Sequence, residues 1–76
     1  MEKYHTTMSD LFEQLGLASS DEGIVSFISQ NKGLRQGVHI EEANFWTRPQ
    51  AEFIKNALLE DAEWTELIDQ LNTRIR

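Results

Sequence analysis

The sequence predicts a small all-α domain of four helices: two short helices, an irregular middle loop and two longer helices. The first observation is periodicity, because apolar residues recur at spacings of three and four in four separate segments. The second is that residues with helix-capping side chains precede these segments. The third is length, because 76 residues are enough for a single domain, 1–76.

The first helix is expected to begin after Thr7 and to end at Gly16. Thr7 has a capping hydroxyl, and Asp10 follows three residues later. One helical stripe is formed by Met8, Leu11, Phe12 and Leu15. Gly16 suits the left-handed position at a helix end, from which Leu17 can fold back onto Phe12.

The second helix is expected to begin at Ser19, because Ser19 and Glu22 have the spacing of a capping box. Its buried stripe is predicted to be Ile24, Phe27 and Ile28, with Val25 at the margin. Gly23 in the first turn is expected to weaken this helix by up to ~1 kcal/mol relative to alanine. The run Asn-Lys-Gly at residues 31–33 is a helix stop signal.

Residues 33–44 are predicted to form an extended loop between the second and third helices. Its apolar residues, which are expected to pin it to the core, are Leu34, Val38 and Ile40. A single short strand over residues 38–40 is the alternative, although one strand has no partner inside a helical domain.

The third helix is expected to run from Arg48 to about Leu59. Thr47 and Gln50 form a capping box at its start, and Pro49 lies in the first turn, where a missing N–H costs nothing. Its buried side is predicted to be Ala51, Ile54 and Leu58, widened by Phe53 and Ala57.

The last segment, residues 62–75, has a longer apolar stripe. Its members are Trp64, Leu67, Ile68, Leu71 and Ile75. One continuous helix from Arg48 to Arg76 would have 29 residues and a length of about 43 Å. That is too long for a domain with a radius of gyration of about 11 Å. We therefore predict a break near Glu60 and Asp61, with Asp61 as the new N-cap.

Composition excludes several classes of function. The net charge of −6 should repel phosphate backbones and anionic lipid surfaces, so neither nucleic acid nor a membrane is expected as a partner. The absence of cysteine excludes a thiolate zinc site and a cysteine nucleophile, and it fits a reducing compartment such as the cytoplasm. No apolar run is long enough for a secretory signal or a membrane span.

Three motifs give the chain a resemblance to a known family. They are Leu-Phe-Glu-Gln-Leu-Gly-Leu at residues 11–17, Phe-Trp-Thr with a glutamine at residues 45–50, and Glu-Asp-Ala-Glu-Trp at residues 60–64. With these motifs the chain resembles a family of small, uncharacterised proteobacterial proteins, a domain of unknown function. The resemblance implies a helical, cytosolic bacterial protein, and it lends no activity, cofactor or site.

Candidate reactive groups are few. The densest set of oxygen ligands for a hard cation is Glu60, Asp61, Glu63 and Glu66, but its pattern favours a solvated helix face. The only histidines, His5 and His39, have no spacing that brings them together, and we interpret them as surface residues. No nucleophile–base pair can be named, so we predict no enzymatic activity, no metal and no cofactor.

The best candidates for an interaction site are apolar. They are Phe45, Trp46, Trp64, Leu71 and Ile75. The last helix has more apolar face than its neighbours should cover, so we expect a second copy to cover Leu71 and Ile75 in a two-fold homodimer. A core enclosed within one chain is the alternative.

The function predicted on this basis is a non-enzymatic protein–protein interaction or regulatory module. Its partners would be a second copy of the chain or an unknown protein. The alternative is a protein that binds a small ligand or a cation in a crevice near Trp46 and the 33–44 loop.

Overall fold

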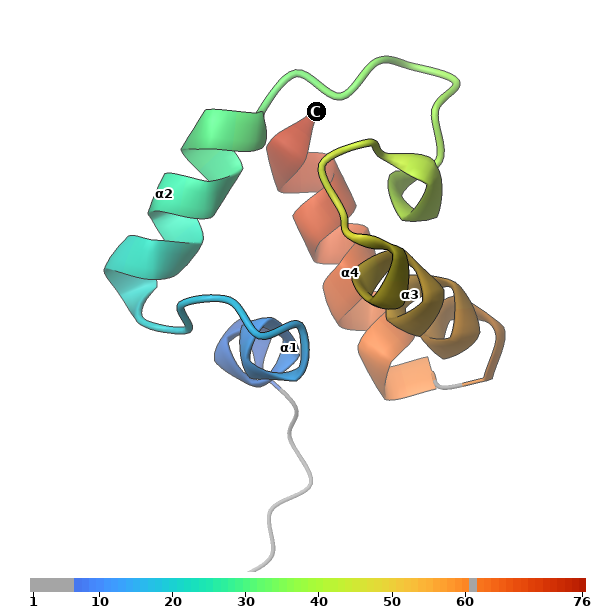
Figure 1. Cartoon of the computed structure of the whole chain (residues 1–76), viewed down its shortest axis with the longest axis horizontal. Helices are drawn as coiled ribbons and strands as arrows, with labels where there is room; N and C mark the ends of the chain where they lie inside the picture. The colour runs from blue at the N-terminus through green and yellow to red at the C-terminus, as the bar shows by residue number, and fades with distance from the viewer. Residues whose placement is uncertain (1–6, 61) are drawn as a thin grey trace, which may run out of the picture.

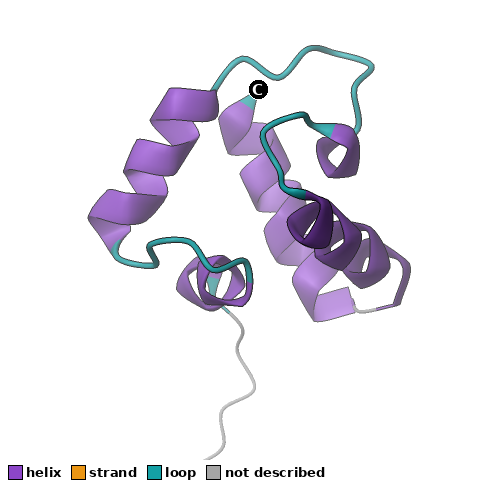
Figure 2. Ribbon diagram, in the orientation of Figure 1, coloured by secondary structure: helices purple, strands orange, loops and turns teal. Residues whose placement is uncertain are grey.

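The computed structural model describes residues 7–60 and 62–76, and in this part of the chain the secondary structure is entirely helical. Figure 2 shows helices joined by loops. In chain order the elements are α1 (Met8–Gln14), α2 (Asp21–Asn31), the short 3₁₀ helix η1 (Ile40–Glu42), α3 (Arg48–Glu60) and α4 (Ala62–Ile75). The predicted all-α class is confirmed.

Helix α4 is the central element of the fold. It packs against α1, α2 and α3, while α3 also packs against η1 (Figure 1). The largest fully buried side chains are Leu11, Phe12, Ile54, Ile68, Leu71 and Ile75, and half of them belong to α4. Because each such side chain contributes about 1.5–3 kcal/mol on burial, α4 contributes more of this packing energy than any other single helix.

The expected exposure of Leu71 and Ile75 is wrong. Both side chains are 0% exposed within a single chain. The reason is that the chain crosses the end of α4 after α2, where the N–H groups of Gly33 and Leu34 both donate to the carbonyl oxygen of Ile75, at 2.7 and 3.2 Å. This crossing closes the part of the stripe that the helices alone would leave open, so the stripe gives no reason for a dimer.

The ends of α1 follow the sequence prediction closely. The hydroxyl of Thr7 accepts from the N–H of Asp10 at 3.1 Å, and the Asp10 carboxylate accepts from the N–H of Thr7 at 3.0 Å. At the other end Gly16 has φ +74°, and the N–H of Leu17 donates to the carbonyl of Phe12 at 2.9 Å. These contacts satisfy backbone groups that the helix leaves unpaired at its two ends.

Helix α2 begins one residue later than predicted. The N-cap is Ser20, whose hydroxyl accepts from the N–H of Gly23 at 3.0 Å. Ser19 instead uses its carbonyl to accept from the Ser9 hydroxyl at 2.9 Å, which ties the connection between the helices back to α1. The carbonyl of Ser20, and not that of Ser19, accepts the first helical hydrogen bond, from the N–H of Ile24 at 2.9 Å.

Gly23 has a packing role that the sequence does not show. A Cβ atom at this position would lie 2.6 Å from the Cβ of Ala18 and 2.9 Å from its carbonyl oxygen. Real Cβ atoms do not approach that closely, so only glycine lets the α1–α2 connection lie against the first turn of α2. The cost to helix propensity is therefore offset by close packing.

Gln50 joins two helices that are far apart in the sequence. Its side-chain oxygen accepts from the backbone N–H of Thr47 at 2.9 Å. In return, the backbone N–H of Gln50 donates to the Thr47 hydroxyl at 3.4 Å. The predicted capping box is confirmed. The side-chain nitrogen of Gln50 also donates to the carbonyl of Leu15 at 2.9 Å, so the start of α3 is attached to the end of α1.

The predicted break between the last two helices is confirmed, because α3 ends at Glu60 and α4 begins at Ala62. The expected N-cap, Asp61, lies outside the described residues. In the 33–44 loop no strand forms over residues 38–40, and Ile40 instead begins η1, which the sequence analysis missed.

Replacing Gly23 with alanine should destabilise the protein, although alanine is the better helix former. We expect a loss of about 1–3 kcal/mol, because the new methyl group overlaps Ala18. Chemical denaturation monitored by circular dichroism measures it. The matched control is Ser26→Ala on the exposed face of the same helix, which should change stability little. A stabilised Gly23→Ala variant would contradict the packing account.

Two variants of Gln50 separate its two roles. Gln50→Glu keeps an oxygen for the N–H of Thr47 but has no N–H for the carbonyl of Leu15, whereas Gln50→Ala removes both contacts. We expect losses of roughly 1 kcal/mol for the first variant and roughly 2 kcal/mol for the second. Thermal unfolding of the three proteins side by side measures the difference. Equal stability of Gln50→Glu and the parent protein would show that the bond to Leu15 contributes nothing.

Candidate binding site

An aromatic cluster fills the space between α2 and the entrance of α3. Phe27 is its hub, with ring centroids 5.5 Å from Phe12, 5.7 Å from Phe45 and 5.5 Å from Trp46. The Phe27 and Trp46 rings are stacked, and the other two pairs meet edge to face. Such ring geometries stabilise the cluster beyond what the burial of its apolar surface contributes. The cluster is therefore a rigid support for the neighbouring surface.

Trp46 is a structural residue of this cluster. Its side chain is only 8% exposed, and its indole N–H donates to the carbonyl of Ile40 at 2.8 Å. This buried hydrogen bond holds η1 against the entrance of α3. The indole has one donor and that donor is used, so Trp46 supports a neighbouring site rather than contacting a ligand.

A crevice of about 360 Å³ opens beside this cluster, between the end of α2 and the chain that leads to α3. It is lined by residues 31–35, Val38 and residues 42–45. Its walls combine apolar side chains with charged and amide groups, and half-buried Phe45 is the link to the aromatic cluster. This is the crevice that the sequence analysis placed near Trp46 and the 33–44 loop, although Trp46 itself does not line it.

The end of α4 fixes the loop that forms this crevice. Figure 1 shows the C-terminal end of α4 close to the end of α2, where Gly33 and Leu34 bond to Ile75. The guanidinium of Arg76 donates to the carbonyl of Arg35 at 2.8 Å and to that of Val38 at 2.7 Å. The planar side chain of Arg76 thus connects the two ends of the turn between Arg35 and Val38. The backbone that lines the crevice is therefore already ordered without a ligand.

The charges of the crevice are opposite to those of the chain as a whole. Two of its lining residues, Lys32 and Arg35, are cationic, and only Glu42 is anionic. Lys32 donates one of its three N–H bonds to the carbonyl of Arg74 at 3.1 Å. Within residues 7–60 and 62–76, the guanidinium of Arg35 has neither a hydrogen-bond nor an ion-pair partner. An exposed arginine is therefore free to bind at the edge of the crevice.

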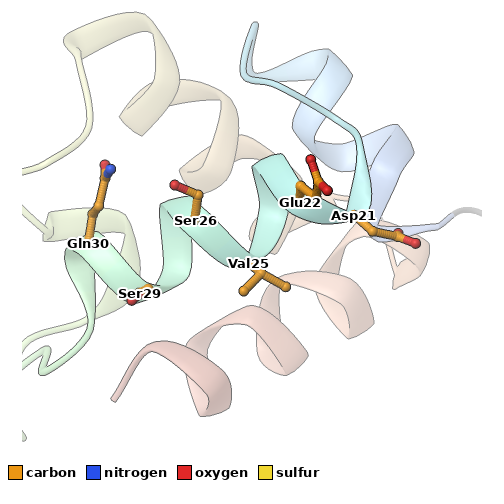
Figure 3. A pocket seen from close by; sticks show the side chains of 6 residues that line it. All are labelled: Asp21, Glu22, Val25, Ser26, Ser29 and Gln30. Atoms are coloured by element: carbon orange, nitrogen blue, oxygen red, sulfur yellow. The ribbon is translucent and has the colours of Figure 1, made fainter.

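A second hollow lies on the outer face of α2. It is lined by Asp21, Glu22, Val25, Ser26, Ser29 and Gln30. Figure 3 shows that all six side chains come from this one helix. No other element closes over it, and Val25 at its centre is 56% exposed. The hollow is a helix surface rather than an enclosing site, and the 31–45 crevice is the better candidate.

The five predicted interaction residues do not form one site. Phe45 and Trp46 lie together, with ring centroids 4.9 Å apart. Trp64 is half-buried between the last two helices, where its ring meets Phe53 at 5.7 Å, and Leu71 and Ile75 are core residues.

The basic residues of the crevice were not predicted from the sequence. A signal was present, because Lys32 and Arg35 are the only cationic residues between Lys3 and Arg48 in an acidic chain. The contribution of Arg76 had no such signal, since it lies 41 residues from Arg35 in the sequence and reaches it only through the fold.

The other candidate groups are not assembled into a site. Among residues 7–60 and 62–76, no three His, Cys, Asp or Glu side chains are placed to hold a metal ion. His39 is exposed before η1, while His5 and Asp61 lie outside the described residues. In the described part of the chain, no helix has the length and apolar character needed to cross a membrane.

Comparison with known proteins identifies a family without an assigned role. A family model described as "Protein of unknown function (DUF2789)" matches residues 1–75. No curated protein and no solved structure matches the chain.

Replacing Arg76 with lysine should loosen the loop without unfolding the protein. An ammonium group cannot hold the carbonyls of Arg35 and Val38 together as a planar guanidinium does. We expect amide hydrogen exchange at Val38 and Leu34 to accelerate roughly five- to tenfold, with little change in the thermal midpoint. Arg48→Lys, at an exposed arginine that begins α3, is the control. Unchanged exchange in the Arg76→Lys protein would show that this clamp does not hold the loop.

Proposed function

The chain belongs to this family of unknown function, and from that premise we propose that it is a non-catalytic binding module that receives its ligand in the 31–45 crevice. The observation that supports the proposal most directly is the lining of the crevice. Apolar walls and a few convergent polar groups on a preformed backbone are the usual features of a small-molecule site. Its volume of about 360 Å³ lies at the lower end of the usual range for such sites, ~300–1,000 Å³.

Six hydroxyl side chains bond to the backbone, which supports a non-catalytic role for them. Thr7, Ser20 and Thr47 cap helices. Ser9 donates to a backbone carbonyl, as do Thr65 and Thr73. A nucleophile needs a base within hydrogen-bond reach, and these groups are instead engaged with the backbone. The proposal therefore assigns no catalytic residue.

The charged residues of the crevice distinguish between the two ligands predicted from the sequence, a small molecule and a cation. A cation would meet Lys32 and Arg35 at the crevice and be repelled, so a cation is disfavoured there. A protein partner bound through exposed apolar helix faces has weaker support, because Val25 and Leu59 are exposed singly on different helices. Self-association, a regulatory role, a cytoplasmic location and a bacterial origin stay predictions.

A fragment screen followed by two-dimensional NMR tests the proposed module. The library should contain acidic, basic and neutral compounds. We expect hits whose chemical-shift changes cluster at the amides of residues 31–35 and 42–45, with dissociation constants of roughly 0.1–1 mM for compounds of that size. Shift changes confined to residues 21–30, or no hits at all, would refute the proposal.

A matched pair of variants makes this test specific. Asn44→Trp places a large ring at the crevice lining, while Ser29→Trp places the same ring on the outer face of α2. Both positions are exposed, so neither change should disturb the core. Binding should be lost in Asn44→Trp and kept in Ser29→Trp.

A further inference from the structure

We infer that the ligand of the 31–45 crevice is a small organic carboxylate, with the carboxylate bound by Arg35 and Lys32 and the apolar part against Val38 and Phe45. The inference rests on the proposed function and names the ligand class for that site. In a chain of net charge −6, the two cationic residues of its N-terminal half that the structure describes both line this one crevice. A local positive field in an acidic protein favours an anion.

Capping of helix ends explains some of these cations but not Arg35. The carbonyl ends of α2 and α4 both lie at this side of the molecule, and basic groups are favourable at such ends. Lys32 bonds to the carbonyl of Arg74, and Arg76 bonds to the carbonyls of Arg35 and Val38, so both have structural partners. The guanidinium of Arg35 has no partner in the described part of the chain, so its N–H donors are available to a ligand.

The backbone of Arg35 is held in place while its side chain is free. Its carbonyl accepts from Arg76 and also from the N–H of Val38 at 3.2 Å, which closes a turn. A guanidinium on a fixed backbone can bind a planar carboxylate through two parallel N–H bonds, with little ordering cost for the loop. Lys32 retains two of its three N–H donors for the same anion.

A carboxylate fits this position better than a phosphate. Phosphate sites in proteins commonly use the N-terminus of a helix, where several backbone N–H groups point at the anion. Here the neighbouring helix ends are the C-termini of α2 and α4, whose partial charges are negative. These helix ends therefore offer no N-terminal N–H groups to a phosphate, and an anion here would be bound by the side chains of Lys32 and Arg35.

The other residues that line the crevice favour a ligand with an apolar group next to its carboxylate. Leu34, Val38 and Phe45 are each half-buried, so each leaves part of its apolar surface uncovered. Phe45 is backed by Phe27 and Trp46 and cannot turn away without breaking the aromatic cluster. A compact aliphatic or aromatic group placed there would gain burial on a surface that is already ordered.

The test compares three compounds of one shape and different charge: phenylacetate, phenylacetamide and phenethylamine. Trp64→Phe leaves Trp46 as the only indole, and its fluorescence reports on the cluster behind Phe45. NMR titration locates each compound. We expect phenylacetate to bind about tenfold more tightly than phenylacetamide, with phenethylamine weakest. Raising the salt concentration to about 0.5 M should remove much of the preference.

Two variants with the same change in net charge decide the role of Arg35. Arg35→Gln should remove the preference for phenylacetate over phenylacetamide, because the guanidinium that would bind the carboxylate is lost. Arg48→Gln removes one positive charge at the exposed start of α3 and should keep the preference. A preference that survives Arg35→Gln would overturn the assignment of the carboxylate contact.

The outcomes separate this inference from the proposed function. Equal or tighter crevice binding of phenylacetamide or phenethylamine would overturn the carboxylate assignment and leave the crevice as a binding site. Tighter binding of inorganic phosphate than of phenylacetate would overturn it as well. A carboxylate panel that fails while the fragment screen succeeds refutes only the ligand class, and failure of both refutes the binding module itself.

Discussion

Complete enclosure of the α4 stripe is the constraint on which the rest of this structure depends. Ile68, Leu71 and Ile75 are 0% exposed in a chain of only 76 residues. Small domains bury a modest fraction of their surface, so a single helix must be covered from several sides to reach this state. Helices α1, α2 and α3 all pack against α4, and the chain after α2 must then cross its end.

That crossing also forms one side of the crevice in which we propose that a ligand binds. The N–H groups of Gly33 and Leu34 bond to Ile75, and Arg76 bonds to two carbonyls of the following loop. The end of α4 therefore helps to shape the loop, together with the turn in which the N–H of Val38 donates to the carbonyl of Arg35. Its other wall is the aromatic cluster around Phe27, so the crevice lies between two parts of the molecule that are already ordered.

Single polar side chains connect elements that the apolar core alone would leave loosely oriented. Gln50 caps α3 and also bonds to the end of α1, and the indole of Trp46 bonds to the start of η1. Each of these side chains donates to a backbone carbonyl of another segment, that of Leu15 for Gln50 and that of Ile40 for Trp46. A ligand in the crevice would contact a surface supported by these bonds, which makes a preformed site compatible with a small domain.

The sequence by itself determined whatever depends on neighbours three or four residues apart. The helix start at Thr7, the capping box at Thr47, the left-handed Gly16 and the apolar stripes were all predicted because their partners are local. Of the candidate site, the sequence located the 33–44 loop but neither Arg35 nor the structural role of Trp46. Tertiary structure alone decided the cap at Ser20, the need for glycine beside Ala18, and the burial of Leu71 and Ile75. Each of these depends on a contact between segments that approach one another only after the helices have packed. The periodicity of apolar residues does not predict such contacts.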